Sequence, residues 1–306
     1  MMFSWRRSAS LLLVASLSTI LSQPMAQAAP ASHNDRAMAA MKLFKEGKYH
    51  EAELAYRSML ADDEAAHGFD HLDTEQDRKN LVTILGLQGD FLNAENLLKS
   101  YIEKSTTLHG AESKQVIELR DSLAGVLLKE GRPAEAVHEY REILTIREKQ
   151  TGADSVDVAR ARSYLGGALA DTGEFAEAEK LLRAAQPVLD KNLGPENPVS
   201  LINRTNLCKP LEAGKRYSDL AIEQRTILDI LQKVLGPGRP EVVFSALNLA
   251  TTLKLEGKNA EALEMAKKCE TAFNAMLGPD NPKTAEAHKL VEDLQELVNA
   301  RKPNFR

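Results

Sequence analysis

Glycine recurs along this chain with a period of 42 residues, and this period constrains the fold more than any other feature. Six glycines share one register: Gly68, Gly110, Gly152, Gly194, Gly236 and Gly278. A second set lies near the midpoints between them: Gly47, Gly89, Gly131, Gly173 and Gly257, with Gly214 one position early. Self-similarity at a fixed period is the signature of repeat architectures, in which each unit packs on its neighbours. The chain is therefore predicted to be an array of units, each holding two elements.

The elements between these glycines are predicted to be helices. Apolar residues recur there at three- and four-residue spacing, as in Leu123, Leu127 and Leu128, and not in the strict alternation of strands. Glycine suits the left-handed conformation that ends a helix, and three of the glycines are followed directly by proline: Pro195, Pro237 and Pro279. Each unit is thus predicted to be helix, tight turn, helix and longer turn.

The side chains show how the two helices of a unit pack. Leucine stands four residues before the tight turn in all six units: Leu43, Leu85, Leu127, Leu169, Leu211 and Leu253. Three residues earlier the side chains are mostly small: Ala40, Val82, Ala124, Gly166, Cys208 and Ala250. After the turn, alanine recurs as Ala52, Ala94, Ala136, Ala178 and Ala262. Small residues facing one another predict a close helix crossing.

The period alone permits a HEAT array or a tetratricopeptide array. The packing positions, together with the segments 173–182 and 193–198, resemble the tetratricopeptide repeat (TPR) family, in its 42-residue, long-helix subtype found in kinesin light chain and many bacterial proteins. The resemblance covers residues 33–300. It implies an all-α fold, a right-handed α-solenoid of about six helix-turn-helix units with a C-terminal capping helix.

The glycine register divides the chain into expected segments. The repeat units are expected near residues 33–66, 73–108, 113–150, 155–192, 198–234 and 240–276, with a capping helix at 283–300. Residues 29–32 are expected to be a short linker and residues 301–306 a C-terminal tail.

Residues 1–28 have the order of a secretory signal peptide. Arg6 and Arg7 precede an apolar run from Leu11 to Leu21, which ends near small residues at 26–28. This run is shorter than the ~20 residues needed to cross a bilayer. We therefore expect a bacterial protein that is secreted across the inner membrane, cleaved and periplasmic, without a membrane anchor.

Charge and cysteine content argue against a nucleic-acid-binding protein and against a disulfide-stabilised scaffold. The formal net charge is −5, and loss of the two leader arginines would make it more negative, so nucleic acid is not expected as a partner. Cys208 and Cys269 are too few for a disulfide scaffold. Both lie at packing positions, and no bridge between them is expected.

The sequence holds no phosphate-binding loop, dinucleotide fingerprint, zinc-protease helix or nucleophile elbow, so no catalytic residue and no cofactor is assigned. The densest metal-like cluster is His67, Asp70, His71 and Asp73 in the first long linker. Imidazole and carboxylate at this spacing could bind a divalent ion. The favoured interpretation is a solvated turn with helix-capping Asp, and no metal site is assigned.

Arginine occupies one position in five of the six units: Arg36, Arg78, Arg120, Arg162 and Arg204. Stacked units would align them into a ladder. They could orient an acidic peptide through bidentate contacts to carboxylates. The favoured interpretation is that each stem packs along the next repeat and each guanidinium pairs with a nearby acid.

The first helices of such repeats line the inner face of the solenoid, and in kinesin-light-chain-type repeats an asparagine ladder there contacts the backbone of a bound peptide. Asparagine stands at the matching position in three units, as Asn80, Asn206 and Asn248, with Ser122 and Tyr164 between them. An amide can both donate to and accept from an extended peptide. In the best frame for the carboxylate clamp of chaperone-binding members, only Lys79 and Arg160 are of the expected type, which leaves that specialised function unsupported. These seven residues are the candidate groove; a role within the repeat is the alternative for the asparagines.

The favoured function is an exported, non-catalytic scaffold that binds a protein or peptide partner in its concave groove. The alternative is a structural or oligomeric subunit of an envelope assembly that acts through its convex face or its ends. A metal-dependent enzyme using the His67–Asp73 cluster is a third hypothesis.

Overall fold

The computed structural model describes residues 32–300, and the expected leader and C-terminal tail lie outside this range. Every regular element in the described part of the chain is an α-helix. By internal contacts the chain divides into two compact units, residues 1–90 and 91–306. Each unit is described separately below.

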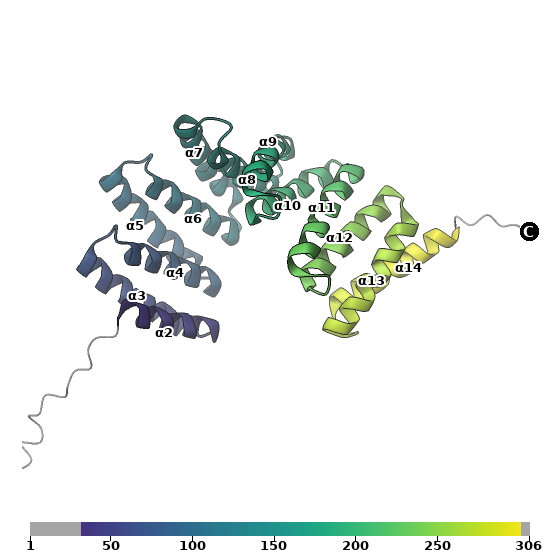
Figure 1. Ribbon diagram of the computed structural model, residues 1–306, viewed down its shortest axis with the longest axis horizontal. Helices are drawn as coiled ribbons and strands as arrows, with labels where there is room; N and C mark the ends of the chain where they lie inside the picture. Colours follow the sequence, from purple (N-terminus) through teal and green to yellow (C-terminus); the bar gives the residue numbers. More distant parts are fainter. Residues whose placement is uncertain (1–31, 301–306) are drawn as a thin grey trace, which may run out of the picture. The chain divides into compact units, whose positions relative to one another are not determined.

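The first unit holds three consecutive helices (Figure 1). These are α2 (His33–Lys45), α3 (Tyr49–His67) and α4 (Leu72–Gln88). Helix α3 packs against both α2 and α4. Its buried face includes Ala52, Tyr56 and Met59, which recur at helical spacing.

The second unit holds the remaining ten described helices, each packed on the next along the chain. The first helices of its repeats are α6 (Lys114–Glu130), α8 (Val156–Thr172), α10 (Pro198–Ala213) and α12 (Pro240–Glu256). The second helices are α5 (Phe91–His109), α7 (Pro133–Thr151), α9 (Phe175–Leu193), α11 (Tyr217–Leu235) and α13 (Asn259–Leu277). Helix α14 (Pro282–Ala300) packs mainly on α13 and also touches α12.

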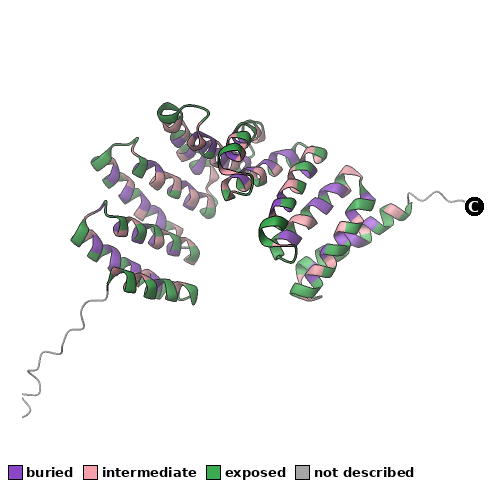
Figure 2. Ribbon diagram, in the orientation of Figure 1, coloured by how far each residue is buried: buried purple, intermediate pink, exposed green. Residues whose placement is uncertain are grey.

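The core follows the positions that the period marks. Leu85, Leu127, Leu169, Leu211 and Leu253 are buried, and the alanines at 52, 94, 136, 178 and 262 have no exposed surface. Figure 2 shows the buried residues along one face of each helix, with exposed residues on the opposite face. Burial of this apolar face supplies most of the stability of helices in such a fold.

The tight turns end the first helices through left-handed residues. Gly131 has φ of 81° and its N–H bonds back to the last turn of α6. In the fifth repeat glycine comes one residue early, and α10 ends at Ala213. The left-handed position falls instead on Lys215, with φ of 53°, the only described non-glycine residue with positive φ.

Ion pairs link successive repeats of the second unit. Arg132 Nη1 lies 2.6 Å from Glu95 Oε2, and Arg216 pairs with Glu179 at the same offset of 37 residues. Glu95 is nearly buried, at 5% exposed, and the hydrogen bonds from Arg132 and Lys99 hold its pKa below the usual value. These charges therefore contribute to the order in which helices stack, although each exposed pair is worth at most about 1 kcal/mol.

Candidate functional site

The candidate groove residues of the second unit lie on its first helices. Ser122 is on α6, Arg160 and Tyr164 are on α8, Asn206 is on α10 and Asn248 is on α12. Helices α8 and α10 contact each other directly, so Tyr164 and Asn206 belong to adjoining elements. Ser122, Arg160 and Asn248 are exposed, and Tyr164 and Asn206 are partly buried. In this unit the first helices therefore expose polar side chains, with the apolar Ile202 of α10 and Phe244 of α12 also exposed.

Asn206 is held within the repeats more than the other candidates. Its Nδ2 lies 3.4 Å from the Ser163 carbonyl of α8, and a Cβ added at Gly167 would come within 2.5 Å of the same nitrogen. Pro210 has no N–H, so the Asn206 carbonyl lacks the usual helix hydrogen bond. The side chain of Asn206 thus has a packing role, while its amide oxygen and backbone carbonyl remain chemically suited to accept a hydrogen bond.

Asn248 differs from Asn206 because its exposed amide makes no hydrogen bond to any residue in the described part of the chain. Ser122 donates to the Glu118 carbonyl of its own helix at 3.0 Å. In the first unit, Asn80 Oδ1 accepts from Gln76 at 3.0 Å and Lys79 pairs with Glu75, both on α4. Asn248 and Arg160 are therefore the candidates that internal bonding leaves most accessible.

A partly buried carboxylate adjoins the same face. Burial raises the pKa of Asp121, on α6, to about 6, and Arg160 and Arg147 oppose that shift. The rings of Tyr140 and Tyr164 lie 5.8 Å apart, and burial followed by the charge of Asp121 raises the pKa of both phenols. This cluster of an acid, two phenols and an arginine was not predicted; the only signal was an Asp beside a groove position.

The arginine ladder is engaged within the repeats. Arg78 donates to the Phe69 carbonyl at 2.7 Å and lies over the Phe69 ring. Arg162 donates to the Ala153 carbonyl and to Glu148, and Arg204 bonds Asp190 and Glu223. Arg36 and Arg120 lie near Asp62 and Glu139. These contacts support the packing interpretation of the ladder.

Both cysteines are free thiols in the helix packing. Burial raises the pKa of Cys208 to about 12 and that of Cys269 to about 11. Neither thiol is therefore an effective nucleophile near neutral pH.

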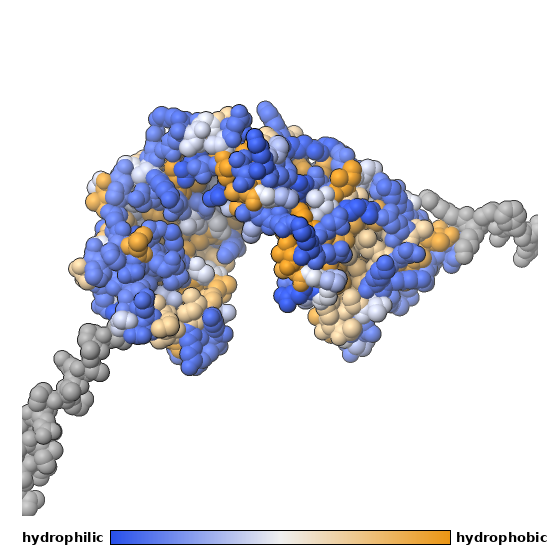
Figure 3. Space-filling view, viewed as in Figure 1, coloured by the Kyte–Doolittle hydropathy of each residue, from blue (hydrophilic) through white to orange (hydrophobic). Residues whose placement is uncertain are grey.

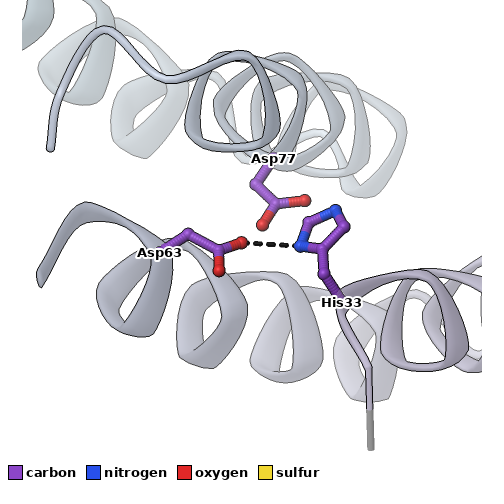
Figure 4. A group of neighbouring side chains, drawn as sticks. All are labelled: His33, Asp63 and Asp77. Atoms are coloured by element: carbon purple, nitrogen blue, oxygen red, sulfur yellow. Dashed lines mark hydrogen bonds and ion pairs between the residues drawn. The ribbon is translucent and has the colours of Figure 1, made fainter. Parts of the chain in front are cut away.

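The structure places the four-residue cluster between the end of α3, where His67 is the last residue, and the start of α4. His71 accepts a hydrogen bond from the Asp73 N–H and so caps this helix, and the His67 and His71 rings lie 4.6 Å apart. Asp70 and Asp73 are on the same turn and helix start. A closer set of metal-type side chains in residues 32–300 is His33, Asp63 and Asp77 (Figure 4), and His33 Nε2 lies 3.8 Å from Asp73 Oδ1 of the linker cluster.

His33, Asp63 and Asp77 come from three helices of the first unit and point toward one another (Figure 4). Their ligand atoms all lie within 4.8 Å of one another. His33 Nδ1 and Asp63 Oδ2 are 2.7 Å apart. Burial raises the pKa of Asp77 to about 7, and Asp63 raises it further while His33 and Arg36 oppose the shift. Sequence reasoning missed this cluster because its members are far apart in the chain.

Taken together, these elements define an all-α solenoid of helix pairs, as the glycine period predicts. Residues 115–207 match the tetratricopeptide repeat. The predicted repeat type is thereby confirmed for this stretch, which covers α6 to α9 and most of α10.

Solved structures share this fold. The nearly identical TPR-like repeats of a kinesin light chain-like protein from Podosopora anserina align with a TM-score of 0.58 at 19% identity, over 68% of this chain and 99% of that one. BtubC (BKLC) from P. vanneervenii gives a TM-score of 0.54 at 15% identity, over 90% of this chain and 96% of that one. A Rap protein in complex with Competence and Sporulation Factor gives a TM-score of 0.52 at 13% identity, over 94% of this chain and 81% of that one. A comparison with curated proteins finds no match.

No helix in the described range is both long and apolar enough to span a membrane. On the face drawn in Figure 3 most of the described surface is hydrophilic, with apolar side chains among the polar ones. Exposed apolar residues include Ile222 on α11 and Leu255 on α12.

Proposed function

We propose that this protein is a non-catalytic scaffold that binds an extended segment of a protein partner on the first-helix face of its second unit. The observation that carries the proposal is the exposed Asn248 amide, which packing does not use, on the same set of helices as the exposed Arg160. An amide side chain can donate and accept hydrogen bonds with a peptide backbone, and an arginine binds acidic groups on the partner. The Rap protein noted above, which shares the fold, is in complex with Competence and Sporulation Factor in its structure.

The chemistry of this face favours a partner with acidic side chains or a free carboxylate near Arg160. Asp121, with its raised pKa, lies close enough to Arg160 to interact with it. An acidic group of a partner would therefore compete with Asp121 for the guanidinium.

Site-specific photocrosslinking tests the proposed face. A photoreactive residue replaces Asn248 or Arg160 in the first-helix set, and Ile222 or Lys267 in the second-helix set as matched exposed controls. The proposal predicts that both first-helix positions crosslink to one common partner in an envelope extract, and that the controls do not. Crosslinks confined to Ile222 and Lys267 would instead identify the outer-face assembly subunit and contradict the proposal.

The proposed place of action is the periplasm of a bacterium. The support is the leader pattern of residues 1–28, with Arg6 and Arg7 before an apolar run. Cell fractionation followed by N-terminal sequencing tests it. We expect a periplasmic chain that begins near Ala29, whereas an uncut chain in the cytosol would refute export.

A further inference from the structure

The starting observation concerns three core positions of the first unit, on helices α2, α3 and α4. His33, Asp63 and Asp77 stand at positions that, five periods later, hold Val243, Phe273 and Ala287. Those three residues are buried together in the apolar core of the last repeat. Repeat packing therefore explains an apolar trio at these positions and does not explain an imidazole with two carboxylates.

Burial makes the presence of an imidazole and two carboxylates at these core positions unfavourable for the stability of the fold. Asp77 is only 1% exposed and Asp63 only 7%. Neither carboxylate oxygen of Asp77 has a hydrogen-bond donor, although both are shielded from solvent. A buried acid without a partner costs several kcal/mol on general grounds. The Asp77 carboxylate points into the space between His33 and Asp63 (Figure 4).

We propose that His33, Asp63 and Asp77 form a binding site for a first-row divalent transition metal ion, with Zn²⁺ as a suitable occupant. A neutral imidazole and two carboxylates together balance the charge of a divalent cation. Imidazole nitrogen with carboxylate oxygen suits Zn²⁺ and its neighbours, whereas Mg²⁺ and Ca²⁺ prefer sites made of oxygen alone.

The geometry requires only small movements. Ligands at ~2.0–2.1 Å from a tetrahedral Zn²⁺ lie roughly 3.3 Å from one another. His33 Nδ1 and Asp63 Oδ2, now 2.7 Å apart, would separate slightly, and the remaining ligand atoms, within 4.8 Å, would draw together. His33 is partly exposed at the start of α2, so a water molecule would supply the fourth ligand from the solvent side.

Such a site would stabilise the packing of the first repeat against helix α4. His33 lies on α2, Asp63 on α3 and Asp77 on α4, so one ion would join all three helices of the first unit. Helix α2 is the shortest described helix, with 13 residues and a single buried side chain, Ala40. Metal binding would thus contribute stability where apolar burial is smallest.

Zinc titration of the tag-free full chain tests the proposal. Chelator-treated protein is titrated with Zn²⁺ in competition with a chromophoric chelator, and Co²⁺ absorption reports the coordination geometry. We expect one Zn²⁺ per chain, an intense tetrahedral Co²⁺ band, and a higher melting temperature with Zn²⁺ than with Mg²⁺.

Three variants locate the site. Asp77→Asn and His33→Gln should each weaken Zn²⁺ binding by roughly tenfold or more, since each removes a ligand. His71→Gln, in the linker cluster, is the matched control and should bind as the parent does. Circular dichroism checks folding, and His33→Gln, which alters a partly exposed side chain, keeps the test valid if Asp77→Asn misfolds. Absence of stoichiometric Zn²⁺ binding, or a loss in His71→Gln equal to that in His33→Gln, would overturn the proposal.

Discussion

Asp121 shows how one residue can link stability to the proposed binding face. Its folded pKa is about 6 against an ordinary value of 3.8, because burial disfavours the charged carboxylate. An acid with a raised folded pKa stabilises the folded state only while it is protonated. Its unfavourable contribution therefore appears as pH rises from about 4 to about 6 and is fully present at pH 7.

Asp121→Asn should raise the free energy of unfolding at pH 7 by on the order of 2 kcal/mol and change it little at pH 4, because the amide carries no charge to desolvate. Urea denaturation at both pH values measures the difference. The control is Asp171→Asn, which removes an exposed acid that pairs with Lys209 at 2.8 Å. Equal effects of Asp121→Asn on the free energy of unfolding at the two pH values would refute the raised pKa of Asp121.

Lys215 is the second residue with a specific consequence for stability. It occupies the left-handed position that glycine fills in the five other described tight turns, and a side chain is strained there. Lys215→Gly should stabilise the protein by about 1 kcal/mol, whereas Lys215→Ala should give no gain because it keeps a Cβ. Thermal unfolding of the two variants gives the comparison, and a gain from alanine equal to that from glycine would contradict this account.

At the scale of elements, the packing of α8 on α9 depends on one small residue. A Cβ added at Gly166 would lie 2.6 Å from Cγ of Leu182, which is fully buried. The sequence predicted a small residue at this crossing from its register. It could not predict that Gly167, one residue on, accommodates the Asn206 side chain, because that contact depends on the spacing of α8 and α10.

Gly166→Ala should destabilise the second unit by about 1–3 kcal/mol, since overpacking exceeds the gain in helix propensity. Gly125→Ala is the matched control, because nothing lies within 4 Å of a Cβ there. It should stabilise α6 by up to about 1 kcal/mol. Chemical denaturation of the pair should thus give shifts of opposite sign, and shifts of the same sign would show that the crossing is not tightly packed.

The helices could be predicted from the periodicity of glycine and leucine, because glycine ends helices at local turns and leucine packs at the helix crossing that every repeat shares. The hydrogen-bond and ion-pair partners of polar side chains could not be predicted from this periodicity. Arg78 reaches a backbone carbonyl nine residues away, and Asp77 meets His33 across 44 residues of chain, so neither contact leaves a local pattern. Comparing His33 with Val243, at the same repeat position, is the signal that could have found the cluster.

At the scale of the whole molecule, repetition separates the residues that stack helices from those left for other roles. Leucines, alanines and ladder arginines take part in packing in both units, and the two cysteines do so in the second unit. In the second unit the accessible polar residues include Asn248 and Arg160. The central claim is that these residues, and not the outer helices, hold the partner.

The most direct test is the affinity of the partner that photocrosslinking identifies, measured by titration against the full chain. The double variant Asn248→Ala with Arg160→Ala should weaken binding by roughly tenfold or more, because it removes a backbone-reading amide and a charge-assisted contact. The matched double variant Lys267→Ala with Arg225→Ala, on the second helices, should bind as the parent does. Unchanged affinity in the first variant with a loss in the second would contradict the account.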